Sequence, residues 1–173
     1  MHFAFLWGFA LLEPSPKFFL KEGSEMRTLG VYLHIPFCRS KCRYCDFTSF
    51  AGKEALIPPY VGALIKEIEL QSAALSDYVV DTVFFGGGTP TLLGAAMVHE
   101  ILEALARHYR IDPQAEITVE GNPATVEQCE PSRLRKAGVN RFSLGVQSFD
   151  EKLLHVLGRI HNSDDVLRTY DNL

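Results

Sequence analysis

Three of the chain's four cysteines lie within eight residues, in the stretch LHIPFCRSKCRYCDF. Cys38, Cys42 and Cys45 have the spacing C-x3-C-x2-C, and no fourth cysteine follows nearby. A structural zinc site takes four protein ligands, so His34 or Asp46 would have to complete it. Three thiolates can instead hold three corners of a [4Fe–4S] cluster, which leaves the fourth iron open to an external chelating ligand. We expect the cluster rather than zinc.

Further candidate binding residues follow apolar stretches later in the chain. The segment GGGTP, residues 86–90, is neither a dinucleotide fingerprint nor a P-loop, but its glycines leave backbone N–H and C=O groups open to a small polar ligand. Glu120 and Gln147 end apolar stretches and suit hydrogen bonding to hydroxyls or an amine, or else brace a loop. The planar fork of Arg159 suits a carboxylate, and an exposed surface arginine is the alternative.

The remaining polar residues carry weaker signals. The basic residues between the cysteines are either solvated or offset the negative charge of a cluster: Arg39, Lys41 and Arg43. Cys129 lies far along the chain on a predicted helix, where we expect a small buried residue rather than a ligand. Three histidines show no ligand spacing and are expected to be ordinary polar residues: His34, His155 and His161.

Short strand-like runs alternate with longer helix-like stretches. The predicted strands are residues 30–35, 81–87, 115–123 and 139–148, and the predicted helices are 58–75, 92–109, 125–138, 149–158 and 162–173. Gly138 is expected to end its helix, Pro131 to start or kink one, and Asn162 or Ser163 to cap the last.

Four repeats of strand then helix indicate an α/β fold with a parallel sheet and outer helices, either open or closed into a barrel. In both architectures, binding residues lie in loops at the carboxyl ends of the strands. The cysteines, the GGGTP segment, Glu120 and Gln147 fall after four successive strands, so we expect them to meet at one edge. Four parallel strands cannot close a barrel, and we interpret residues 26–173 as the N-terminal part of a longer domain.

Composition narrows the class of protein. The chain has 173 residues, 47% of them hydrophobic, and a formal net charge of −4. This mildly acidic balance argues against a general nucleic-acid or membrane-surface role, so we expect no nucleic-acid partner and no stable membrane insertion. Clustered cysteines without a clear secretory signal are typical of metal binding in a reducing compartment, so we expect a cytoplasmic protein.

The first 25 residues are expected to be a non-native or disordered extension. Their apolar run is too short to span a bilayer and lacks a basic flank and a cleavage site. The segment KEGSE can be encoded by codons that form a purine-rich ribosome-binding site just before Met26. Translation would then begin at Met26. A nucleotide sequence without that site would contradict the hypothesis.

Six linked motifs carry a family resemblance. The segments VYLHIPFC, CRYCDF, VFFGGGTPTLL, EGNP, AGVNRFSLGVQSFD and LGRIH resemble the radical SAM superfamily, whose cluster motif has an aromatic before the last cysteine, here Tyr44. The resemblance is to the branch that holds oxygen-independent coproporphyrinogen III oxidase and the haem chaperone HemW. It implies a partial (β/α) barrel of six strands, of which about four units are present.

The resemblance also implies a site. The three cysteines would hold a [4Fe–4S] cluster, and S-adenosylmethionine would chelate its open iron. Tyr32 would lie beside the S-adenosylmethionine, and other residues would form its pocket: Gly87, Gly88, Thr89, Glu120, Gln147 and Arg159. Oxidases of this branch bind a second S-adenosylmethionine, partly through the same positions, so the molecule that each residue touches stays open.

One position separates the two functions within the branch. The oxidase has another cysteine two residues after the third, where this chain has Phe47. The resemblance therefore favours a HemW-type protein that binds haem as cargo, passes it to an acceptor protein and takes an electron from a reducing donor. The alternatives are an oxidase that decarboxylates porphyrinogen propionates and an inactive truncated fragment.

Overall fold

The computed structural model describes residues 5–6, 9–12, 27–126 and 130–173. Its strands are β1 (Phe5–Leu6), β2 (Phe9–Leu12), β3 (Arg27–Ile35), β4 (Phe37–Cys38), β5 (Phe50–Ala51), β6 (Tyr78–Gly87), β7 (Arg110–Gly121) and β8 (Arg141–Leu144). Its α-helices are α1 (Ile57–Ser72), α2 (Gly94–His108), α3 (Pro123–Val126), α4 (Pro131–Lys136), α5 (Glu151–Leu157) and α6 (Ser163–Asp171). Short 3-10 turns, η1 (Glu54–Leu56), η2 (Ala73–Leu75) and η3 (Pro90–Leu93), adjoin them.

The main sheet has the strand order β1-β2-β3-β6-β7-β8. Strands β3, β6, β7 and β8 run parallel and are separated along the chain by helices, which confirms the predicted α/β class. One further strand, β2, which the sequence did not predict, pairs antiparallel with β3 at the edge of this parallel sheet. The free backbone groups along the β3 edge can bond any extended segment, whichever way it runs.

The N-terminal segment is described only in part. Strands β1 and β2 form a small antiparallel pair within it, and the other residues before Arg27 lie outside the described residues. The hypotheses of a non-native or disordered extension and of a start at Met26 therefore stay predictions. Among the described helices, none combines the length and the apolar character needed to cross a membrane.

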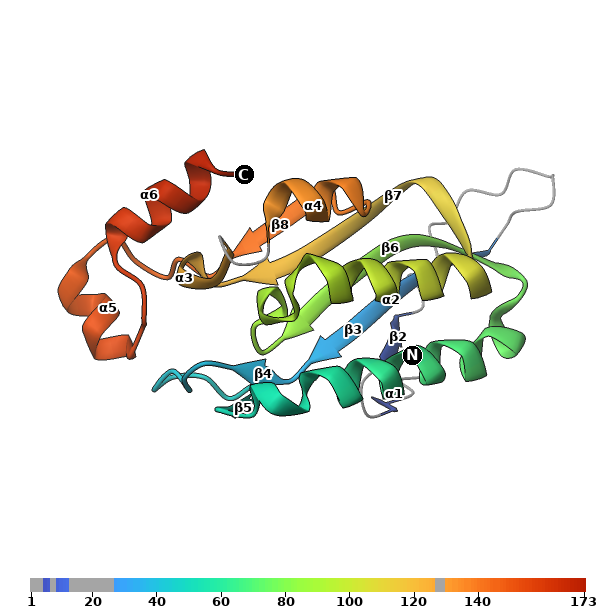
Figure 1. The fold of residues 1–173 in the computed structure, drawn as a ribbon, viewed down its shortest axis with the longest axis horizontal. Coiled ribbons are helices and arrows are strands. Elements are labelled where there is room, and N and C mark those ends of the chain that lie inside the picture. Colours follow the sequence, from blue (N-terminus) through green and yellow to red (C-terminus); the bar gives the residue numbers. More distant parts are fainter. Residues whose placement is uncertain (1–4, 7–8, 13–26, 127–129) are drawn as a thin grey trace.

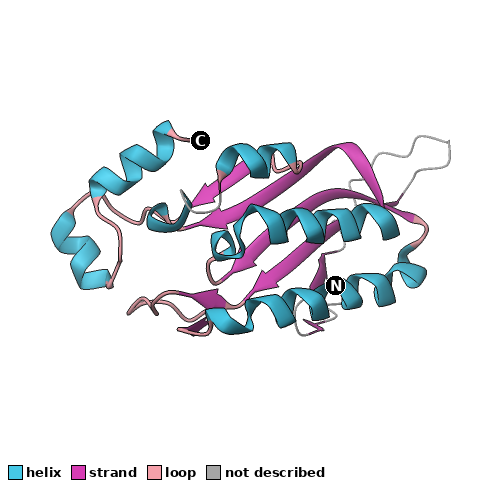
Figure 2. Cartoon of the chain, in the orientation of Figure 1, coloured by secondary structure: helices cyan, strands magenta, loops and turns pink. Residues whose placement is uncertain are grey.

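One face of the parallel sheet carries the core. Alternate residues of β3 are buried against the helices: Leu29, Val31, Leu33 and Ile35. Helix α1 buries residues at the helical spacing: Ile57, Val61, Leu64 and Ile68. Helices α1, α2 and α4 cover the same face in Figure 2. The opposite face of β3 presents half-buried Tyr32 and His34.

Two predicted elements differ from the structure. The helix predicted over 125–138 is divided, because α3 ends at Val126 and Glu130 adopts a left-handed conformation with φ 51° before α4, which starts at Pro131. Pro131 disfavours a helical conformation at the residue before it and starts α4 instead. Gly138, with φ 110°, follows α4 as expected. Strand β8 is shorter than predicted.

The carboxyl ends of the four parallel strands point to the same end of the molecule (Figure 1). The cysteine loop leaves β3 there, and α5 and α6 lie beyond that end of the sheet. Asn162 caps α6 through a reciprocal pair of bonds with Asp165, which settles the choice between Asn162 and Ser163. Because the four parallel strands end at one edge of the sheet, the predicted convergence of the loops that follow them is confirmed.

Candidate functional site

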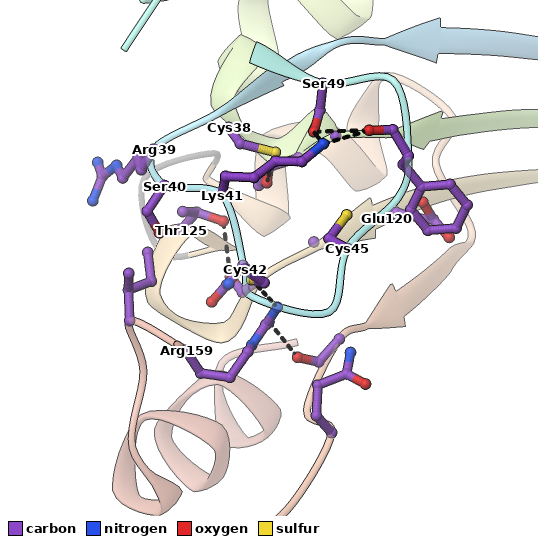
Figure 3. Close-up of a pocket in the computed structure, with 18 of the residues that line it drawn as sticks. Cys38, Arg39, Ser40, Lys41, Cys42, Cys45, Ser49, Glu120, Thr125 and Arg159 are labelled. Carbon is purple, nitrogen blue, oxygen red and sulfur yellow. Dashed lines mark hydrogen bonds between the residues drawn. The ribbon is translucent and has the colours of Figure 1, made fainter. Parts of the chain in front are cut away.

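A cavity of about 380 Å³ lies at the carboxyl ends of the parallel strands. It is lined by all but one of the residues predicted to bind a cluster or cofactor: Cys38, Cys42, Tyr44, Cys45, Gly87, Gly88, Thr89, Glu120, Gln147 and Arg159. Figure 3 shows the cysteine loop on one side of this space, with Glu120 and Arg159 reaching it from other elements. The volume lies in the range of small-molecule and cofactor sites.

The cysteine loop is fastened by its own polar groups. Cys38, Cys42 and Cys45 are free and half-buried, and the N–H of Cys45 donates to the Cys42 carbonyl oxygen at 3.1 Å. Lys41 Nζ donates to the carbonyl oxygen of Phe47 at 2.6 Å and to Ser49 Oγ at 3.2 Å. Lys41 therefore closes the loop around the cysteines and is not simply solvated.

The end of α5 fixes the other side of the same loop. The N–H of Arg43 donates to the Leu157 carbonyl oxygen at 3.1 Å, and Arg43 Nη1 donates to the Val156 carbonyl oxygen at 3.3 Å. Gly158, with φ 72°, ends the helix against the Arg43 side chain. The chain then turns directly into Arg159, which brings that residue to the cysteines.

The thiols suit a cluster with several irons. Within the described part of the chain, no three His, Cys, Asp or Glu side chains are arranged to hold a single metal ion. A [4Fe–4S] cluster needs no such convergence, because each thiolate binds a different iron. Three free thiols on one loop, around a cavity of this size, fit that donor set.

The glycine turn is bonded to the segment that enters the cysteine loop. The N–H groups of Gly88 and Thr89 donate to the carbonyl oxygens of Ile35 and Phe37, each at 2.8 Å. The N–H of Gly87 donates to the Glu120 carboxylate. These N–H groups were expected to be open to a ligand, and that expectation was wrong. The turn can still offer carbonyl oxygens, which accept bonds from an ammonium group.

Glu120 provides an acidic group at the cavity. Burial raises the pKa of its half-buried carboxyl group, and the bond from Gly87 partly opposes this shift. Tyr32 lies outside the cavity lining, where its ring stacks on Phe84 and its hydroxyl is 3.3 Å from His34 Nδ1. Burial and then the charge of Glu120 raise the pKa of Tyr32.

Arg159 joins the cysteine loop to the loop after β8. Its Nη1 donates to Cys42 Sγ at 3.2 Å and to Tyr44 Oη at 3.3 Å, and its Nη2 donates to the Gly145 carbonyl oxygen at 2.6 Å. Its buried Nε has no hydrogen-bond partner among the described residues. An unpaired buried donor beside a cavity indicates a missing acceptor. The alternative of an exposed surface arginine was therefore wrong.

Gln147 adopts an uncommon backbone conformation. Its φ of 67° lies in the left-handed region, which residues other than glycine rarely adopt. Residues in this conformation are often found at binding sites. A Cβ at Gly145 would lie 3.3 Å from both Gln147 Nε2 and Arg159 Nη2. Both polar side chains therefore lie over Gly145, which confirms that they come together.

The sequence interpretation missed several polar residues of the cavity: Ser49, Asn122, Thr125 and Ser143. Asn122 was visible as the polar residue directly after the third parallel strand. The hydroxyl groups of Thr125 and Thr91 are hydrogen-bonded, with 2.6 Å between their oxygens. No spacing in the sequence predicts this contact. Cys129 lies outside the described residues, so its predicted burial stays a prediction.

A family model described as "Radical SAM superfamily" matches residues 32–173. The chain belongs to the radical SAM superfamily. Membership of this superfamily implies a [4Fe–4S] cluster and S-adenosylmethionine as cofactors. The residues around the cavity fit both: three free thiols for the cluster, and carbonyl oxygens with an unpaired arginine donor for an amino acid group.

Relatives in this superfamily are similar over most of the chain. Heme chaperone HemW of Escherichia coli (strain K12) is 43% identical over 145 residues, which are 83% of this chain and 38% of that protein. Heme chaperone HemW of Buchnera aphidicola subsp. Schizaphis graminum is 35% identical over 151 residues, 86% of this chain and 40% of that protein. The chain thus spans about two fifths of the length of these curated relatives.

A solved structure has the same fold. Coproporphyrinogen III oxidase (HemN) from Escherichia coli, described as a radical SAM enzyme, matches with a TM-score of 0.76 at 28% identity. The match covers 82% of this chain and 33% of that one. The described α/β structure is therefore part of a radical SAM fold, as predicted.

Proposed function

We propose that this chain is part of a HemW-type protein, which binds a [4Fe–4S] cluster, S-adenosylmethionine and haem, and delivers haem to acceptor proteins. The observation that carries the choice is Phe47, which stands where the oxidase of this branch has a further cysteine. Phe47 lines the cavity, with its side chain 67% exposed, and its carbonyl oxygen accepts the bond from Lys41. The relatives named heme chaperone HemW, at up to 43% identity, support the same choice.

Each part of the cavity has a proposed role. Cys38, Cys42 and Cys45 would hold the [4Fe–4S] cluster, and S-adenosylmethionine would bind at the iron that has no cysteine. When bound, the cluster supplies one electron to that ligand. The carbonyl oxygens of the glycine turn would accept from the N–H groups of the ligand's amine, and the guanidinium of Arg159 would donate to its carboxylate.

The remaining partners are also proposals. We propose a reducing electron donor, a haem-acceptor protein and a cytoplasmic location, and neither a nucleic-acid partner nor stable membrane insertion. Three free thiols on one loop support the cytoplasmic location, and the net charge of −4 argues against a nucleic-acid partner. The relatives named heme chaperone HemW support the haem-acceptor protein.

Anaerobic incubation with coproporphyrinogen III separates the chaperone from the oxidase. The protein, reconstituted with iron and sulfide and supplied with S-adenosylmethionine and a reductant, should form no protoporphyrinogen IX. In a parallel titration it should bind haem stably. Substantial conversion to protoporphyrinogen IX would overturn the proposal in favour of the oxidase. Absence of both a cluster and haem binding would favour the inactive fragment.

The bond from Arg159 to Cys42 predicts an effect on the cluster itself. Hydrogen bonds to cluster sulfurs favour the reduced, more negative state, so Arg159→Met should make the reduction potential more negative. The loss of one such hydrogen bond corresponds to a shift of the reduction potential by about 20–60 mV. A spectroscopic redox titration checks this, with Lys152→Met, an exposed cation on α5, as control. Equal potentials in Arg159→Met and the parent protein would contradict the prediction.

A further inference from the structure

His161 is a buried histidine that the proposed chemistry does not use. Its side chain is almost fully enclosed, with the residue 4% exposed. Its Nδ1 lies 3.1 Å from Asn122 Oδ1, and its Nε2 lies 3.0 Å from the carbonyl oxygen of Val146. The ring therefore bridges two segments that are distant in the sequence.

The bridged segments all contribute to the cavity. Asn122 begins the loop after β7 and itself lines the cavity. Val146 lies in the loop after β8, next to Gln147, and Arg159 is two residues before His161. One imidazole ring thus fixes the relative positions of three segments whose side chains converge on the proposed S-adenosylmethionine pocket.

Both atoms that face the ring are hydrogen-bond acceptors. The carbonyl oxygen of Val146 can only accept. The Oδ1 of Asn122 also accepts the N–H of Ala124 at 3.2 Å, which fixes the orientation assigned to this amide. A neutral imidazole has one N–H and can satisfy one of the two acceptors, whereas an imidazolium donates to both.

The surroundings of the ring determine when it carries the second proton. Burial lowers the pKa of His161 below its ordinary value. The bond to the Val146 carbonyl opposes that shift, the charge of Arg159 adds to it, and the carboxylates of Asp165 and Glu151 oppose it. Because burial outweighs the second hydrogen bond, the ring is neutral near pH 7 in the bridged arrangement, and a second proton at lower pH opposes that arrangement.

We propose that His161 is a positioning residue, which as a neutral imidazole fixes the loops after β7 and β8 relative to Arg159. This inference rests on the proposed function for the identity of the ligand. Its consequence is that the affinity for S-adenosylmethionine has a component that falls as the ring gains a second proton at low pH, and that this component belongs to His161.

The first test compares His161→Gln with the parent protein. Glutamine keeps one hydrogen-bond donor but does not titrate. As the pH falls from about 8 through the lowered pKa of His161, the affinity of the reconstituted parent for S-adenosylmethionine should fall about three- to tenfold more than that of His161→Gln, as the loss of one bridging hydrogen bond predicts. His155→Gln, at an exposed position on α5, should behave like the parent. The same pH dependence in His161→Gln and the parent would overturn the inference.

The second test does not need the cofactors. In His161→Leu, the backbone amides of Gly121, Asn122 and Ala124 and of residues 145–148 should exchange with deuterium at least about tenfold faster than in the parent, because the ring no longer joins the two loops. Unchanged exchange in both loops would overturn the inference. Failure of the parent protein to bind S-adenosylmethionine would count against the proposed function alone, since the exchange measurement stands without the ligand.

Discussion

Alanine in place of Cys42 should leave the protein almost without iron and sulfide after anaerobic reconstitution. Cys38, Cys42 and Cys45 are the free thiols of the cavity, and each holds its own iron in the proposed cluster. With one thiolate gone, two irons lack protein ligands and the cluster has only two attachments. Iron and sulfide should fall from about four of each per chain to less than about a tenth of that amount.

Cys129→Ala is the matched control for this prediction. It removes the fourth cysteine of the chain, which we propose is not a ligand, and should retain the full content of iron and sulfide. A cluster that survives in Cys42→Ala, or one that is lost in Cys129→Ala, would assign the ligands differently. Colorimetric iron and sulfide analysis gives the answer without any assay of activity.

Gly88→Ala should weaken S-adenosylmethionine binding by more than about tenfold and destabilise the fold by about 1–3 kcal/mol. A Cβ at Gly88 would lie 2.6 Å from the carbonyl oxygen of Phe37 and 2.8 Å from that of Ile35. These are backbone atoms at the entry to the cysteine loop and cannot move aside as a flexible side chain can. The turn must shift, which breaks the bonds that its N–H groups make to the same two oxygens.

Gly62→Ala separates this steric effect from the general effect of replacing a glycine. Gly62 is exposed within α1, and nothing lies within 4 Å of the Cβ that alanine would add. The variant should bind S-adenosylmethionine normally and be more stable by about 0.5–1 kcal/mol, the gain in helix propensity. Thermal unfolding and ligand titration check both variants. Normal binding by Gly88→Ala would show that the turn does not shape the pocket.

Much of the fold could be predicted from local patterns of apolar residues in the sequence. Alternating burial along β3 and the three- and four-residue spacing of buried positions in α1 reflect periodicities that are visible in the sequence. The break at Glu130 was harder to foresee, because Pro131 could either kink a helix or start one. The pairing of β2 with β3 depends on which segment reaches a free edge, and no sequence period encodes that choice.

The candidate site was predictable where residue type and strand position agreed. Cysteines, glycines and single polar residues after four strands had to meet, since parallel strands end at one edge. The sequence could not show which groups were already bonded within the protein. The N–H groups of the glycine turn are directed at Ile35, Phe37 and Glu120, and the ring of His161 is buried between two loops. Such contacts depend on three-dimensional distances rather than on spacing.

The central claim is that three cysteines leave one iron open, and that S-adenosylmethionine occupies it. Electron–nuclear double resonance on the reduced cluster, with S-adenosylmethionine labelled with nitrogen-15 in its amino group and oxygen-17 in its carboxylate, tests this directly. The account predicts hyperfine coupling from both labels, as expected of groups bound to the open iron. A reduced cluster that shows no coupling to either label, with S-adenosylmethionine in excess, would contradict it.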